Sequence, residues 1–196
     1  MIPSKKTGLF FGSFNPIHTG HLILAHYMLE FTGLDQVWFV VSPQNPFKKR
    51  QPLLEDHHRL ALLKEAIEDD PRFRAIDIEL RLPRPSYTIH TLTHLREQYP
   101  VREFVLIMGL DILPAFHKWK QYEQILNDYQ LYVYPRPGDH PHPYEGHPSV
   151  HLIKGVPQFE ISSSFIRESI SNGKDMRYFL PERVNRYIRE MHFYEG

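Results

Sequence analysis

Two histidines stand where a short apolar run gives way to a helical pattern, in the segment GSFNPIHTGH (12–21). Gly20 allows the backbone to approach a ligand closely, and free N–H groups at the start of the following helix attract anions. His18 and His21 add imidazole donors, which can bond phosphate oxygens whether they are neutral or charged. The segment therefore indicates an anion site, although a polar turn that happens to contain histidine gives the same pattern.

A second segment suited to anions is ISSSFIR (161–167). Ser162 and Ser163 place hydroxyls and backbone N–H groups at a helix start, pointing one way. One turn later, Arg167 carries a forked guanidinium that suits phosphate. One serine is enough to cap a helix, so three in succession favour anion binding over capping alone.

A basic loop is the third candidate, in the segment SPQNPFKKR (42–50). Its prolines lack the backbone N–H that a helix or a paired strand requires, so we expect a loop. Lys48 could close over a polyphosphate or remain solvated, and the pattern leaves both open. Lys49 and Arg50 are better explained as solvated charges.

The scaffold that must position these segments alternates strands and helices. Continuous apolar runs are typical of buried parallel strands, and amphipathic runs are typical of helices. The expected strands cover residues 7–11, 37–41, 73–78, 103–109, 131–134 and 150–153. The expected helices cover residues 20–33, 56–70 (with Asp56 as cap and an end before its last acids), 86–100, 118–127, 161–173 and 181–194.

This alternation predicts an α/β fold, a Rossmann-like doubly wound parallel sheet with flanking helices and a C-terminal helical segment. Ligands of such sheets bind at the carboxyl ends of the strands, so the candidate segments should share one rim. The 196 residues fit one domain, 1–196, with the C-terminal helices (about 162–194) packed on it.

Composition excludes several classes of function. Lys plus Arg and Asp plus Glu number 23 each, so the chain has no general attraction for nucleic acid or membrane. The absence of cysteine rules out disulfides, thiolate catalysis and cysteine-based zinc sites. No apolar run reaches roughly 18 residues, and the N-terminus predicts a first strand and no signal peptide. We therefore expect a cytoplasmic protein.

Several of the 13 histidines lie in the segment PRPGDHPHPYEGHP (135–148). By composition alone the segment could be a metal-binding tract. Its prolines and glycines favour an exposed loop instead.

Taken together, the motifs resemble a known family. GSFNPIHTGH resembles the GGTFDPIHxGH signature of the nucleotidyltransferase superfamily, and ISSSFIR resembles its ISSTxIR signature. Ser13, Asn15 and Leu110 depart from the commoner residues. The resemblance runs from about residue 8 to the C-terminal helix. Four further segments are similar to bacterial nicotinate-nucleotide adenylyltransferases: PSYTIHTL (85–92), IMGLDIL (107–113), WKQYEQIL (119–126) and YPRPG (134–138).

The resemblance implies that ATP and nicotinate mononucleotide react to give deamido-NAD and pyrophosphate. Catalysis would rest on positioning and charge stabilisation, without a protein nucleophile. His18 and His21 would contact the α and β phosphates, and Lys48, Ser163 and Arg167 the β and γ phosphates. Mg²⁺ would be bound mainly through the ATP phosphates, with no protein metal site. Further ATP contacts are expected from Gly12, Ser13, Phe14, Gly20, Gly109, Asp111, Ile161 and Ser162.

The pyridine end of the mononucleotide has its own candidates. Trp119 offers a flat face for the nicotinate ring, and its charged and polar neighbours are unlike a core setting. By resemblance, backbone N–H groups near Thr88 and Lys120 would bind the nicotinate carboxylate. Asp111 could accept from ribose hydroxyls or cap a helix. Other expected contacts of the mononucleotide are Asn15, Ser86 and Tyr87.

Three alternatives stay open at this point. A phosphopantetheine adenylyltransferase shares the histidine motif and the serine helix, but those chains are shorter. An enzyme that prefers nicotinamide mononucleotide is a closer rival, which the sequence separates poorly. A nucleotide-binding regulator would keep the pocket without the chemistry, and intact His18 and His21 argue against it. A homo-oligomer is compatible with the sequence.

Overall fold

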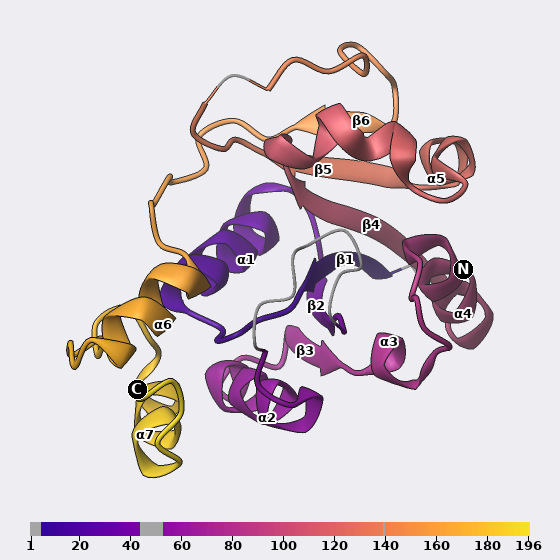
Figure 1. Cartoon of the computed structure of the whole chain (residues 1–196). Helices are drawn as coiled ribbons and strands as arrows, with labels where there is room; N and C mark the ends of the chain where they lie inside the picture. The colour runs from indigo at the N-terminus through magenta and orange to yellow at the C-terminus, as the bar shows by residue number, and fades with distance from the viewer. Residues whose placement is uncertain (1–4, 44–52, 139) are drawn as a thin grey trace.

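One sheet of six parallel strands forms the centre of the molecule (Figure 1), and its order is β3-β2-β1-β4-β5-β6. The computed structural model describes residues 5–43, 53–138 and 140–196. Because β4 pairs with β1, the direction of winding reverses between these two strands. The strands are β1 (Lys5–Gly12), β2 (Gln36–Val41), β3 (Phe73–Ile76), β4 (Arg102–Gly109), β5 (Gln130–Tyr134) and β6 (Val150–Leu152).

Helices cover both faces of the sheet. The helices are α1 (Thr19–Phe31), α2 (Asp56–Ile67), α3 (Ile78–Arg81), α4 (Thr88–Gln98), α5 (Tyr122–Asp128), α6 (Ser163–Ser171), α7 (Glu182–Glu190) and the 3-10 helix η1 (Leu110–Lys118). Buried side chains of α1, α2, α6 and α7 join one core cluster, and those of α4, α5 and η1 join the other. The predicted doubly wound α/β fold is therefore confirmed.

The central strands are apolar on both faces because helices cover both. Leu9 and Phe10 are neighbours on β1, yet Leu9 packs in the cluster under α4 and Phe10 in the cluster under α1. Successive side chains of a strand point to opposite faces, so a two-sided sheet requires continuous apolar runs. This is why the runs in the sequence locate the strands well.

The sequence predictions were wrong at three local points. The expected helix 118–127 is two elements, η1 and α5, because Trp119 is extended and Gln121 has a φ of 54°. The third strand ends at Ile76, and its expected last residue starts the short α3. The N-cap of α2 is Glu55, whereas Asp56 lies inside the first turn and pairs with Arg59.

The two C-terminal helices share the core of the sheet. Ile166 of α6 and Val184 and Ile188 of α7 are buried in the cluster that contains Phe10 and Phe39. Helix α7 also packs against α2 (Figure 1). Among the residues that the structure describes, no helix is long and apolar enough to cross a membrane.

The histidine-rich segment between β5 and β6 is a loop of turns. His140 contacts the Pro137 carbonyl at 2.9 Å, and His142 accepts from the Tyr144 N–H at 3.2 Å. Across the described ranges, no three His, Asp or Glu side chains gather closely enough to hold a metal ion. These histidines therefore bond to their own loop, in agreement with the loop interpretation of the sequence.

Candidate active site

A cavity of about 730 Å³ opens where the winding of the sheet reverses. Gly12 ends β1 and Gly109 ends β4, and both residues line it. The loop from β1 to α1, the start of η1 and the start of α6 also reach it. The cavity thus occupies the position at which open parallel sheets bind ligands.

Almost all residues predicted for the site line this cavity. Asn15 lies beneath the wall, and Lys48 lies outside the described residues. The predicted residues that line the cavity are Gly12, Ser13, Phe14, His18, Gly20, His21, Ser86, Tyr87, Thr88, Gly109, Asp111, Trp119, Lys120, Ile161, Ser162, Ser163 and Arg167.

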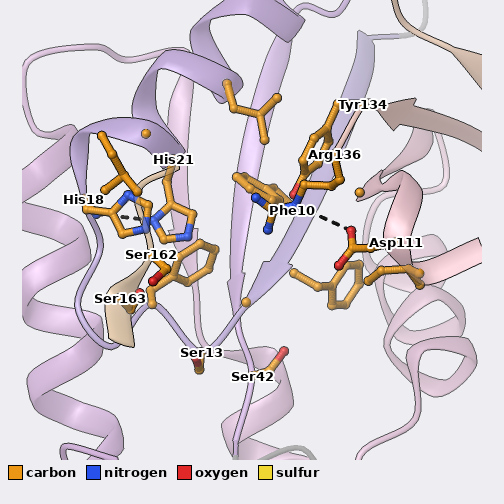
Figure 2. A pocket seen from close by; sticks show the side chains of 18 of the residues that line it. Phe10, Ser13, His18, His21, Ser42, Asp111, Tyr134, Arg136, Ser162 and Ser163 are labelled. Carbon is orange, nitrogen blue, oxygen red and sulfur yellow. Dashed lines mark hydrogen bonds and ion pairs between the residues drawn. The ribbon is translucent and has the colours of Figure 1, made fainter. Parts of the chain in front are cut away.

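His18 and His21 form a stacked pair at one end of the cavity (Figure 2), with ring centroids 3.6 Å apart. His18 is the N-cap of α1, and its backbone N–H donates to Nδ1 of His21 at 3.3 Å. A neutral His21 must therefore carry its proton on Nε2, as a donor. Nδ1 of His18 is buried and has no hydrogen-bond partner among the described residues. A Cβ at Gly20 would lie 3.2 Å from the His18 ring, so glycine leaves the pair room.

Both imidazoles are neutral at pH 7 in this environment. Burial, and then the positive charge of Arg136, lower the pKa of His18 to about 4. Burial lowers the pKa of His21 well below 6.5, and charges on His18 and Arg136 lower it further. Phe10 and Phe14 meet the His21 ring edge to face. The pair therefore offers N–H donors without a fixed charge.

The start of α6 faces the histidine pair (Figure 2), but its hydroxyls do not point one way as expected. Ser162 accepts from the Phe165 N–H at 3.1 Å, which is ordinary N-capping. Ser163 donates to the Pro16 carbonyl at 2.9 Å. Nη2 of Arg167 donates to Ser164 at 3.3 Å. Of these hydroxyls, that of Ser163 ties α6 to the β1–α1 loop, whereas those of Ser162 and Ser164 bond within the α6 segment.

Asn15 lies behind the cavity wall, fully buried. Its Oδ1 accepts from the Leu54 N–H at 3.2 Å and from the Tyr194 hydroxyl at 2.8 Å. Its carbonyl accepts from Nη1 of Arg167 at 2.8 Å. The structure thus ties Asn15 into the support of the loop, where the sequence had predicted a substrate contact.

Asp111 and Arg136 form the opposite wall (Figure 2), with Nε of Arg136 3.5 Å from Oδ1 of Asp111. The Arg136 guanidinium also lies 5.5 Å from the centre of the Tyr134 ring. A Cβ at Gly109 would collide with Oδ1 of Asp111, so a larger residue there would displace the Asp111 carboxylate. Sequence reasoning did not name Arg136, although the segment YPRPG that contains it carried part of the resemblance.

Aromatic rings and a lysine border the cavity beyond Asp111. Trp119 packs against Phe116 with ring centroids 5.1 Å apart, and its side chain is half-buried. Nζ of Lys120 lies 4.6 Å from the centre of the Tyr87 ring and 3.2 Å from Nε2 of His90. This part of the cavity combines flat apolar surfaces with a positive charge.

Glu79 is a second residue that the sequence did not reveal. It lines the cavity and is only 3% exposed. Thr91 donates to its Oε1 at 2.9 Å. Burial raises the pKa of Glu79, while hydrogen bonds from Ser42 and Thr91 oppose the rise. Its segment resembles the end of a strand in the sequence, so no local signal marks this carboxyl.

Comparisons with known proteins point to one family. The cytidylyltransferase-like family matches residues 9–169. A probable nicotinate-nucleotide adenylyltransferase of Flavobacterium johnsoniae is 51% identical over 192 residues, which are 97% of this chain and 99% of the relative. The corresponding Bacteroides fragilis protein is 54% identical over 93% of this chain and 90% of its own length. The chain belongs to the nicotinate-nucleotide adenylyltransferase family.

The family fold is also recognisable at low sequence identity. The nicotinic acid mononucleotide adenylyltransferase of Plasmodium falciparum, solved as a complex with NaAD, superposes with a TM-score of 0.76 at 20% identity, and the match covers 97% of both chains. At that identity the likeness concerns the fold. The two chains thus share the doubly wound sheet although most of their side chains differ.

Proposed function

We propose that the protein transfers the adenylyl group of ATP to nicotinate mononucleotide and forms deamido-NAD and pyrophosphate, a step of NAD synthesis. One observation carries this proposal: one cavity joins an end suited to phosphates, called the phosphate-binding end below, to an aromatic end. The phosphate-binding end contains the stacked His18–His21 pair and the start of α6. The aromatic end contains Trp119, Tyr87 and Lys120.

The reaction needs no protein nucleophile. A phosphate oxygen of the mononucleotide attacks the α-phosphorus of ATP, a new P–O bond forms, and the bond from the α-phosphorus to the bridging oxygen breaks. Pyrophosphate leaves with the electrons of that bond. The chain contains no cysteine, and the α6 hydroxyls are engaged in contacts within the protein. Catalysis then rests on alignment and on stabilising the charge that develops on phosphate oxygens.

We propose that the two histidines stabilise the negative charge that develops on the phosphate oxygens. His21 presents Nε2–H because its Nδ1 accepts from the His18 backbone. Neutral imidazoles bind phosphate oxygens by hydrogen bonds, and the anionic triphosphate would raise the pKa of both rings. The start of α1, beside Gly20, would add the partial positive charge of the helix dipole.

Cations on both sides of the cavity would hold the outer phosphates. We propose that Lys48, Ser163 and Arg167 contact the β and γ phosphates, as the sequence suggests. The contacts of Arg167 with Asn15 and Ser164 orient its planar guanidinium. Arg136 adds a positive charge near enough to lower the pKa of His18, and we include it among the phosphate ligands.

The remaining ATP contacts follow from position along the rim. We propose that the nucleotide binds against the ends of two strands, at Gly12, Ser13 and Phe14 after β1 and at Gly109 of β4. Ile161 and Ser162, just before α6, would contact the nucleotide from the other side of the cavity.

Magnesium would arrive with ATP. The ion would take most of its oxygen ligands from the ATP phosphates and from water. When bound, Mg²⁺ would neutralise part of the triphosphate charge. Arg136 and Arg167 would share that task from the protein side.

The pyridine mononucleotide would occupy the aromatic end. Trp119 and Tyr87 offer ring faces for the pyridine. Lys120, whose Nζ lies 4.6 Å from the centre of the Tyr87 ring, would place a positive charge near the nicotinate carboxylate. Backbone N–H groups at Thr88 and Lys120 would complete that contact. Ser86 and Asp111 lie where they could bind ribose hydroxyls.

Parallel assays of three acceptors test the proposed function. Pyrophosphate release would be followed with ATP and, in turn, nicotinate mononucleotide, nicotinamide mononucleotide and phosphopantetheine. We expect the highest kcat/KM with nicotinate mononucleotide. Turnover of phosphopantetheine alone would contradict the substrate assignment, and tight binding of ATP without turnover of any acceptor would favour a regulator.

Three broader proposals accompany this function. We infer that residues 1–196 act as one catalytic domain, because α6 and α7 share the core of the sheet. A cytoplasmic location and a homo-oligomer remain predictions. Both can be checked directly, by cell fractionation and by light scattering.

A further inference from the structure

The turn after α7 folds back toward the active site in an unfavourable backbone conformation. His192 and Tyr194 have φ angles of 52° and 66°, in the left-handed region that residues other than glycine seldom adopt. Such conformations persist only where surrounding contacts hold them. Here the Phe193 N–H donates to the Ile188 carbonyl at 3.0 Å, and the Phe193 ring lies 4.7 Å from that of His58.

This turn delivers the Tyr194 hydroxyl to one atom of the β1–α1 loop, Oδ1 of Asn15, at 2.8 Å. The Leu54 N–H donates to the same oxygen at 3.2 Å. A backbone N–H can only donate, so the atom that it contacts must be the carboxamide oxygen of Asn15. The Tyr194 hydroxyl must therefore donate to this oxygen as well. Burial raises the pKa of Tyr194, so the hydroxyl keeps its proton throughout the working pH range.

Main-chain contacts hold the rest of the loop. The buried Arg59 donates to the carbonyls of Ser13 and Ser42. From α6, Arg167 donates to the Asn15 carbonyl, and Ser163 donates to the Pro16 carbonyl. At Asn15 the side chain is held as well, and the turn after α7 supplies a donor to its carboxamide oxygen.

The loop that contains Asn15 also carries the catalytic histidine pair. Asn15 lies between Phe14, which lines the cavity, and His18, which caps α1. We propose that Tyr194 is a positioning residue for the reaction: its hydroxyl fixes the Asn15 carboxamide and, through it, the loop that carries His18. This inference rests on the proposed function, in which alignment supplies much of the rate.

The test is Tyr194→Phe, which removes one hydroxyl and keeps the ring. We expect kcat with ATP and nicotinate mononucleotide to fall about tenfold, because small misplacements of aligned groups are costly in rate. The KM of each substrate should stay within about twofold, because the loop misaligns the reacting groups more than it changes ground-state contacts. The matched control is Tyr178→Phe, whose side chain is 89% exposed; it should behave as the wild type.

Hydrogen exchange provides a readout that does not depend on the substrate. Backbone amides of residues 13–18 should exchange about fivefold faster in Tyr194→Phe than in the wild type, since the loop opens more readily. Amides of the β4 strand should not change. A structural role alone would lower Tm and increase exchange throughout the core.

The outcomes separate cleanly. A lower kcat with unchanged KM, unchanged Tm and faster exchange confined to the loop supports the proposal. An unchanged kcat, or a loss of activity that disappears on cooling together with a lower Tm, overturns it. If the wild type makes no dinucleotide, the proposed function is wrong. The hydrogen-exchange rates of residues 13–18 then still show whether the Tyr194 hydroxyl holds the loop.

Discussion

The stability of this protein should fall as the pH is lowered from 7 to 5, and His18 should account for a defined part of the loss. Burial and the charge of Arg136 lower the pKa of His18 from 6.5 to about 4, and the residue is only 4% exposed. In the unfolded chain, the imidazole titrates near its ordinary value. Between these two pKa values, the unfolded chain therefore binds more protons than the folded protein does.

The sign and size follow from linkage between proton binding and folding. Stability rises with pH wherever the unfolded state binds more protons, so the contribution of His18 is complete above pH 6.5 and is lost toward pH 4. Between pH 7 and pH 5 the loss amounts to about 2 kcal/mol. In a domain of this size it corresponds to roughly 4–8 °C in Tm.

Urea denaturation at pH 7, 6 and 5 measures this contribution directly. The free energy of unfolding of His18→Gln should depend less on pH than that of the wild type, by about 2 kcal/mol over this range. The exposed His117 provides the control, since His117→Gln should keep the wild-type slope. His21 is present in all three proteins, so most of its contribution cancels. Equal slopes for His18→Gln and the wild type would refute the assignment of a buried, neutral His18.

Three substitutions test the roles proposed in the cavity by steady-state kinetics. His21→Ala should lower kcat by about 10²-fold, the cost of losing a donor to the transition state; an unchanged kcat would exclude that role. Trp119→Ala should raise KM for nicotinate mononucleotide and leave KM for ATP unchanged, whereas equal effects on both would place the ring elsewhere. Lys120→Gln should lower kcat/KM for the nicotinate substrate about tenfold, by loss of one nearby charge. The nicotinamide substrate should be unaffected, and an equal loss for both would exclude Lys120 as a specificity residue.

Much of this architecture could be predicted because its signals are local. Each central strand is an apolar run, since helices cover both faces of the sheet. The segments 12–21 and 161–167 each have characteristic residue types at a characteristic spacing. Their meeting at one cavity followed from the rule that parallel strands present their carboxyl ends on the same rim.

The rest of the site depends on contacts between distant residues, which no local pattern records. Tyr194 meets Asn15 across 179 positions of sequence. Glu79 lies in the short helix Ile78–Arg81, whereas the sequence predicted a strand as far as residue 78. The break at Gln121 was missed for a related reason, since a left-handed residue other than glycine has no clear sequence signature.

The central claim is that this cavity transfers the adenylyl group directly from ATP to the mononucleotide, by alignment and charge stabilisation. The most direct test uses ATP with a chiral α-thiophosphate and determines the configuration at phosphorus in the dinucleotide product. A single in-line displacement inverts the configuration, and the account predicts inversion. Retention would require two successive displacements through an adenylylated side chain, and it would contradict the claim that no protein nucleophile takes part.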